Sequence, residues 1–253
     1  MKHYEQLVAL GCFSRGKMAT LLGNDATAAS MIQAYLKKGY IERVRRDLYA
    51  VISLETKQPI SSRYQIGACI FPDAYISHHS AFEFYGYANQ VFYETYVTTH
   101  SRFTDFKYDG IYYHRVAPRC EGYVVQSGKV HVTSVERTVI DSINDVEKIG
   151  GLEETLRCLQ LIPVLDWKKL LEILALYRNG FLYQKCGFLL EQLNVYLNLP
   201  DCFFDECWKH ISGSKRYLTK DTLDNHWHEK WGLYAPKSIQ RIIDKGVTLH
   251  DAV

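Results

Sequence analysis

The chain has 253 residues, of which 47% are hydrophobic and 23% charged, and its formal net charge is +2. This composition is typical of globular domains and excludes a chain that is disordered throughout. No apolar run approaches the length that crosses a bilayer, and the first residues lack the layout of a signal peptide, so we expect a cytoplasmic protein with no membrane partner. The length accommodates a small domain followed by a larger one.

The charge is distributed unevenly along the chain. Residues 1–53 carry eight Lys or Arg against four Asp or Glu, a net charge of +4, so the remaining residues carry −2 of the total of +2. A basic module at one end of a slightly acidic chain is typical of proteins that bind nucleic acid through that end.

The seven cysteines are odd in number and scattered. This pattern argues against a disulfide framework and favours reduced thiols that behave as small apolar side chains. The spacing nearest to a metal site is Cys202, Cys207 and His210, but the two cysteines are further apart than in zinc knuckles and no second pair follows. We therefore expect no bound metal and no cofactor.

Three short helices are predicted at the start of the chain. The first covers residues 3–10 and ends at Gly11, the second follows Ser14 and ends at Gly23, and the third runs from residues 24–25 to Gly39. In the third helix, apolar residues recur at helical spacing and form one core-facing side. Three short helices with these starts and glycine ends are typical of a helix-turn-helix.

The opposite face of the third helix is small, polar and basic. Thr27, Ser30 and Gln33 are suited to contact base edges in the major groove, and Lys37 and Lys38 to contact phosphates. Taken alone, a solvated surface helix shows the same pattern.

Two short strands, at 40–44 and 48–51, follow this helix. Arg45 and Arg46 lie at the turn between them, so the hairpin has the form of a basic wing, and we expect Arg43, Arg45 and Arg46 to contact DNA. The alternative is a charged hairpin that only keeps the surface in water. Because a polar helix followed by a basic hairpin is more specific than either part, we predict that residues 1–53 form a winged helix-turn-helix DNA-binding domain.

Residues 59–253 are predicted to form an α/β (α+β) domain. Helices are expected after a capping box at Ser62 and Gln65 and at 77–86, followed by a mostly antiparallel sheet of four or five strands between residues 91 and 132. A helix opened by Thr133 then carries Arg137 and Asp141 paired on its outer side. Helices near 151–161, 166–178, 181–197 and 201–211 are expected to cover one face of the sheet.

The stretch YLKKGYIERVRRDLY, residues 35–49, resembles the helix-into-wing segment of AbiEi-type antitoxins, which are predicted transcriptional regulators of viral defence. Asp47 stands where glycine is frequent in that family, and Asp can still adopt turn geometry. Segments at 76–81 with Gly86, at 132–141 and at 187–191 follow in the family's order. The resemblance implies the antitoxin of a type IV toxin–antitoxin, or abortive infection, system. Its first domain would repress its own operon by binding the double-stranded operator, and its second would neutralise a nucleotidyltransferase-like toxin, often without a stable complex.

Enzymatic readings have weaker support. Asp73 after Pro72, with Glu94, could begin the metal site of a DNA-directed nuclease that has an N-terminal targeting module, but the strand continues with Thr95 and Tyr96 and not with an acid and a lysine. His78, His79 and Ser80 are neighbours on a helix and point in different directions, which favours capping and packing. No catalytic residue is therefore assigned. The nuclease stays the alternative, and a winged helix used only for protein contacts is a third possibility.

Overall fold

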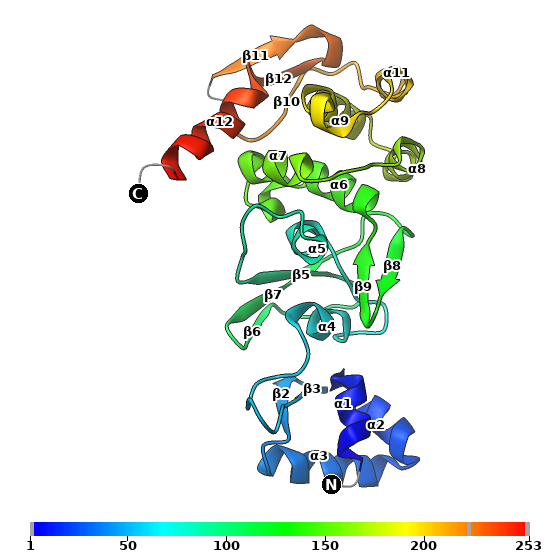
Figure 1. Cartoon of the computed structure of the whole chain (residues 1–253). Helices are drawn as coiled ribbons and strands as arrows, with labels where there is room; N and C mark the ends of the chain where they lie inside the picture. The colour runs from blue at the N-terminus through cyan, green and yellow to red at the C-terminus, as the bar shows by residue number, and fades with distance from the viewer. Residues whose placement is uncertain (1–2, 222–223, 251–253) are drawn as a thin grey trace. The chain divides into compact units, whose positions relative to one another are not determined.

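The computed structural model describes residues 3–221 and 224–250 (Figure 1). The chain divides into two compact units. The first comprises Met1–Ile76, Phe92–Pro118 and Gln126–Val132, and the second comprises Ser77–Val91, Arg119–Val125 and Thr133–Val253. Residues 1–53 are thus grouped with strands that follow them, and their independent folding as a domain stays a prediction.

The first unit begins with three helices and three short strands. These are α1 (Tyr4–Leu10), β1 (Cys12–Phe13), α2 (Arg15–Leu22), α3 (Asp25–Lys37), β2 (Ile41–Arg45) and β3 (Leu48–Val51), and the strands form an antiparallel sheet in the order β1-β3-β2. Ser14 and Asn24 cap α2 and α3, since their side-chain oxygens accept hydrogen bonds from the backbone N–H groups of Lys17 and Thr27. Buried apolar side chains from all three helices, among them Leu7, Met18 and Ile32, form the core.

A helix and a larger sheet complete this part of the chain. The elements are α4 (Arg63–Ala68), β4 (Tyr75–Ile76), β5 (Glu94–Thr98), β6 (Phe106–Tyr108), β7 (Ile111–Val116), β8 (Val124–Ser127) and β9 (Val130–Thr133). The capping box at Ser62 and Gln65 is present at the start of α4. Gly67 lets α4 approach the sheet, because a Cβ there would lie 2.8 Å from Ile76 and 3.0 Å from Val97.

The sheet is mixed, so the expectation of a mostly antiparallel sheet of four or five strands is met only in part. The strand order is β6-β7-β5-β4-β9-β8, and β7 runs parallel to β5, as β9 does to β4, while β4–β5 and β6–β7 are antiparallel. The reason lies in the β6–β7 hairpin, whose second strand pairs with β5. The chain has reversed twice between β5 and β7, so these two strands run in the same direction.

The second unit is mainly helical and has its own core. Its elements are α5 (His78–Tyr85), α6 (Val135–Asn144), η1 (Val146–Ile149), α7 (Leu152–Gln160), α8 (Trp167–Tyr177), α9 (Gly180–Gln192), α10 (Asn194–Leu197), α11 (Asp201–Lys209), β10 (Arg216–Tyr217), β11 (Asn225–His228), η2 (Glu229–Trp231), β12 (Leu233–Pro236) and α12 (Ile239–His250). The helices after residue 150 bury their apolar faces against one another, whereas the sequence predicted that they would cover a sheet. A small sheet, β10-β12-β11, was not predicted.

Two local expectations also need correction. Ser134, and not Thr133, caps α6, because its Oγ accepts a hydrogen bond from the N–H of Arg137. Arg137 and Asp141 are buried, at 1% and 4% exposure, and do not lie on an outer surface. Their spacing places them on one face of α6, but it does not say whether that face meets water.

Cys12 in β1 and Cys69 at the end of α4 form a disulfide, so the expectation that all cysteines are reduced is wrong for this pair. Four of the others, Cys120, Cys158, Cys186 and Cys207, are buried free thiols, as expected for small apolar side chains. The pairing joins residues far apart in the sequence, and spacing alone does not reveal it. Among the described residues, no helix combines the length and the apolar composition of a membrane span. The architecture is therefore a mixed α/β fold of the α+β kind.

Candidate nucleic-acid interface

Helix α3 presents the polar face that its sequence predicts. Ala28, Ile32 and Tyr35 are buried, and the five residues assigned to DNA contact are exposed: Thr27, Ser30, Gln33, Lys37 and Lys38. The Asn24 side chain caps the N-terminus of α3 by accepting a hydrogen bond from the backbone N–H of Thr27. None of the five exposed side chains is needed for this cap. The local periodicity of the helix is enough to explain this agreement.

Three of these residues line one surface hollow. Thr27, Ser30 and Lys38 lie there with Tyr35 and Tyr40, around a volume of about 420 Å³. The two tyrosine rings are 5.5 Å apart in an edge-to-face arrangement and form an apolar wall beside the hydroxyl groups. Gln33 and Lys37 are exposed on α3 but do not line this hollow.

A second hollow lies between the start of α2, the start of α3 and the β2–β3 hairpin. Its lining includes Arg15, Arg43, Arg46, Asp47 and Tyr49. The Arg43 guanidinium stands 5.8 Å from the centre of the Tyr49 ring, which is its cross-strand neighbour. Stacking on a ring restricts an arginine that otherwise has many rotamers, so the Tyr49 ring holds Arg43 at this hollow.

At this hollow, a hydrogen bond between Arg15 and Asp47 connects the start of α2 to the hairpin turn. Asp47 adopts a left-handed conformation with φ of 58°, and its Oδ1 accepts a hydrogen bond of 2.9 Å from the backbone N–H of Arg15. The Arg15 side chain donates to Asp25, and this bond raises the pKa of the exposed guanidinium. Sequence reasoning did not assign Arg15 to the site. Its place directly after the N-cap Ser14, at the start of a helix, is the signal that could have indicated it.

Arg45 does not lie at the exposed hairpin tip, and this expectation is wrong. The turn consists of Arg46 and Asp47, while Arg45 is the last residue of β2 and is partly buried. Its guanidinium stands 5.0 Å from the centre of the Phe103 ring, 5.3 Å from Phe106 and 5.6 Å from Phe71. Burial lowers the pKa of Arg45. The hairpin therefore offers Arg43 and Arg46 to the solvent and holds Arg45 among aromatic rings.

The two acids of the alternative nuclease site are separated. Asp73 accepts hydrogen bonds of 2.8 Å from the Thr99 hydroxyl and the backbone N–H of His100. Burial opposes ionisation of Asp73, but these bonds outweigh it and lower its pKa. Glu94 begins β5, five residues before Thr99, which corresponds to about 16 Å of extended strand. The two carboxylates cannot share one metal ion in this arrangement.

A buried cluster in the second unit has the donor types of a metal site. The ligand atoms of His79, Glu154 and Cys158 lie within 4.8 Å of one another. Glu154 Oε1, however, accepts hydrogen bonds from His79, from Cys158 and from the backbone N–H groups of Asn89 and Gln90. Burial disfavours ionised Glu154, yet these bonds together lower its pKa. The saturated carboxylate indicates that the cluster fixes the 89–90 loop, so we assign no metal here.

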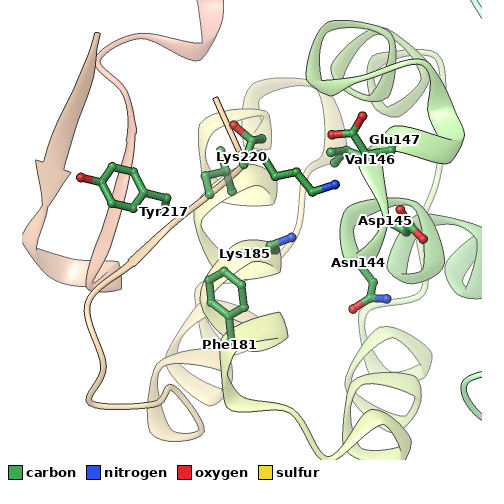
Figure 2. A pocket seen from close by; sticks show the side chains of 10 residues that line it. Asn144, Asp145, Val146, Glu147, Phe181, Lys185, Tyr217 and Lys220 are labelled. Carbon is green, nitrogen blue, oxygen red and sulfur yellow. The ribbon is translucent and has the colours of Figure 1, made fainter. Parts of the chain in front are cut away.

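Figure 2 shows a pocket in the second unit, where Lys185 of α9 and Lys220 face the end of α6 and the start of η1. Asp145 and Glu147 lie on that opposite side, so two lysines face two carboxylates across the pocket. Lys185 is partly buried and stands 5.1 Å from the centre of the Phe181 ring, and burial lowers its pKa. Because the charges lining the pocket balance, it shows no preference for an anion or a cation.

Comparison with known proteins bears on the fold. No protein-family model matches the chain, and no curated protein matches it. Among solved structures, the crystal structure of RV2827C protein from Mycobacterium tuberculosis matches with a TM-score of 0.62 and 12% sequence identity, covering 93% of this chain and 89% of that one. At this identity the match speaks for the fold alone. The chain thus shares its mixed α/β fold with that mycobacterial protein along nearly its whole length.

Proposed function

We propose that the chain is a transcriptional repressor that binds the double-stranded operator of its own operon through a winged helix-turn-helix at residues 1–53. The observation that carries the proposal is the exposed small, polar and basic face of α3 beside a hairpin that exposes Arg43 and Arg46. The element order supports it: three helices, with the short strand β1 after the first, are followed by a two-stranded hairpin.

The dimensions and the charges suit the major groove. A helix of 13 residues is about 20 Å long, and its small Thr27, Ser30 and Ala34 side chains allow its backbone to come close to base edges. Lys37 and Lys38 at its end, and Arg46 at the hairpin turn, supply cations for phosphates on either side. Arg45 has no direct part in this contact.

The antitoxin part of the proposal rests on the resemblance to AbiEi-type proteins. In this reading the chain is a cytoplasmic antitoxin, and residues 59–253 neutralise a nucleotidyltransferase-like toxin encoded beside it. The division of labour has a simple consequence. Charges removed from the α3 face should abolish repression and leave neutralisation intact.

The DNA-binding part is tested with the full chain and its own upstream DNA in a mobility shift over a series of salt concentrations. We expect affinity to fall steeply with salt, with a log–log slope of about −0.9 for each phosphate contact. The variant Lys37→Ala/Lys38→Ala should reduce that slope by about two such contacts, whereas Lys209→Ala/Lys237→Ala, which removes two exposed lysines of the second unit, should not change it. Equal slopes for both variants would refute the proposed interface.

The antitoxin part is tested by survival. The proposal requires a nucleotidyltransferase-like reading frame beside the gene of this chain, and cells that express it should survive when the chain is supplied from an independent promoter. The Lys37→Ala/Lys38→Ala variant should protect them equally, because its changes lie outside residues 59–253. Death in the presence of folded wild-type chain would overturn the antitoxin assignment without affecting the DNA result.

A further inference from the structure

A third hollow of the first unit lies where α1, β1 and the hairpin turn meet the end of α4, and its volume is about 770 Å³. This size is in the range of sites for small organic ligands. Its lining includes apolar side chains: Leu10, Phe13, Ala68, Ile70 and Phe71. The Cys12–Cys69 disulfide also lines it and ties its two walls together.

The polar part of the lining is strongly basic. It contains Lys17, Arg45, Arg46, Lys129 and His131, and the one acid in the lining is Asp47. Asp47 is already engaged, because its Oδ1 accepts the backbone N–H of Arg15. The basic side chains therefore outnumber the available carboxylates, in contrast to the balanced pocket of the second unit.

Arg45 is the least compensated of these cations. Among the described residues, its buried Nη1 has no hydrogen-bond acceptor, and the guanidinium contacts the rings of Phe71, Phe103 and Phe106 and forms no ion pair. Aromatic faces attract a cation, but they do not replace the acceptors that a buried guanidinium loses on leaving water. An anion placed in this hollow would supply part of that missing compensation.

We propose that this hollow binds a small organic anion with an apolar body, namely a carboxylate or a phosphate monoester. The apolar lining takes up the body of the ligand, and Lys17, Arg46 and Lys129 surround its charged group. The charge of the ligand also compensates the Arg45 guanidinium, which lines the same hollow. Lys129 donates to the backbone carbonyl of Ala9, and this bond fixes the position of its ammonium group.

The site has a consequence for regulation, and this consequence rests on the proposed DNA-binding function. Arg46 and Asp47 line both this hollow and the second hollow of the candidate interface. A ligand that engages Arg46 removes a cation from the DNA, so ligand and operator compete for the same hairpin turn. The binding of the anion itself does not depend on the DNA-binding proposal.

The binding is tested with 8-anilinonaphthalene-1-sulfonate, a fluorescent anion with an aromatic body, titrated into the full chain. We expect saturable binding of one probe per chain, weakened at least tenfold in Lys17→Ala/Lys129→Ala. The control Lys209→Ala/Lys237→Ala should bind within twofold of the wild type, and circular dichroism should show both variants to be folded. The variant Ala9→Trp, which places a large side chain at the hollow, should also weaken binding. Unsaturable binding, or equal binding by all variants, would overturn the site.

Competition then identifies the charged group. Displacement of the probe by benzoate indicates a carboxylate ligand, and displacement by phenyl phosphate indicates a phosphate ester. Benzyl alcohol displacing the probe as well as either anion would overturn the need for a charge. Inorganic phosphate displacing it as well as phenyl phosphate would overturn the need for an apolar body.

Failure of this inference is distinguishable from failure of the proposed function. Probe binding without any mobility shift would leave the anion site intact and refute DNA binding, and the reverse result would refute the site alone. Where both occur, a probe concentration of about ten times its dissociation constant should lower operator affinity roughly tenfold by competition. Unchanged affinity would refute the shared use of Arg46.

Discussion

Arg46 of the β2–β3 hairpin and Arg137 of helix α6 have opposite surroundings. In α6, the Nε of Arg137 donates to both carboxylate oxygens of Asp141 at 3.1 Å, and Nη1 donates to the Gly122 carbonyl at 2.8 Å. The Tyr177 hydroxyl also donates to Asp141, and burial raises the pKa of Tyr177. In the hairpin, Arg46 is exposed, and no carboxylate among the described residues pairs with it.

This difference separates charges that serve the fold from charges that are available for a ligand. A buried arginine held by a carboxylate and a backbone carbonyl is expensive to disturb and cannot leave to bind a partner. An exposed, unpaired arginine contributes little to stability and can release counterions when it meets phosphate. Changing each kind of charge should therefore affect different measurements.

The largest effect is expected from Arg137→Met. It should lower the free energy of unfolding by about 3–5 kcal/mol, because Asp141 would stay buried without its cation. Urea denaturation measures this loss, and Arg137→Met/Asp141→Leu should recover a substantial part of it. A loss below about 1 kcal/mol would contradict the structural role of the pair.

The disulfide provides the next effect, within the first unit. Replacing both Cys12 and Cys69 with Ser should lower the free energy of unfolding by about 2–4 kcal/mol under oxidising conditions, because the closed loop no longer restricts the unfolded chain. With a strong reductant present, wild type and variant should unfold alike. A difference that persists in reductant would assign the effect to packing around Cys12.

Sequence reasoning predicted local features well and long-range ones poorly. The caps at Ser14 and Asn24 and the exposed face of α3 follow from periodicity and from side chains near their own backbone. The burial of Arg137 depends on partners elsewhere in the chain, and its spacing from Asp141 could not reveal them.

The same reasoning applies to the candidate site. Arg45 looked exposed because it stands beside Arg46 in a charged turn. Its surroundings are set by aromatic residues of β6 and of two loops, which only tertiary folding brings to the hairpin. The short strands β10 to β12 were missed because runs of two to four residues carry no usable alternation.

A smaller effect, on binding alone, is expected from Gln33→Ala. The variant should lose about 1–3 kcal/mol of binding free energy on the cognate operator and little on unrelated DNA, as expected when a base contact is lost. Mobility shifts on both sequences measure it, with Gln58→Ala, an exposed glutamine outside α3, as the matched control. Uniform weakening on all DNA would mean that Gln33 contacts the backbone.

The finest comparison is between the neighbours Arg45 and Arg46. Arg45→Ala removes contacts with three aromatic rings and should lower the free energy of unfolding by about 0.5–2 kcal/mol, while Arg46→Ala should change it by no more than about 0.5 kcal/mol. The salt dependence of operator binding should show the opposite order, because Arg46→Ala loses about one phosphate contact and Arg45→Ala loses none. Denaturation and a salt series on the two single variants separate these effects, which a double variant would merge. If Arg45→Ala reduced the salt slope as much as Arg46→Ala, the guanidinium would have to leave its aromatic surroundings to reach DNA, and the separation of fold charges from ligand charges would fail at the hairpin.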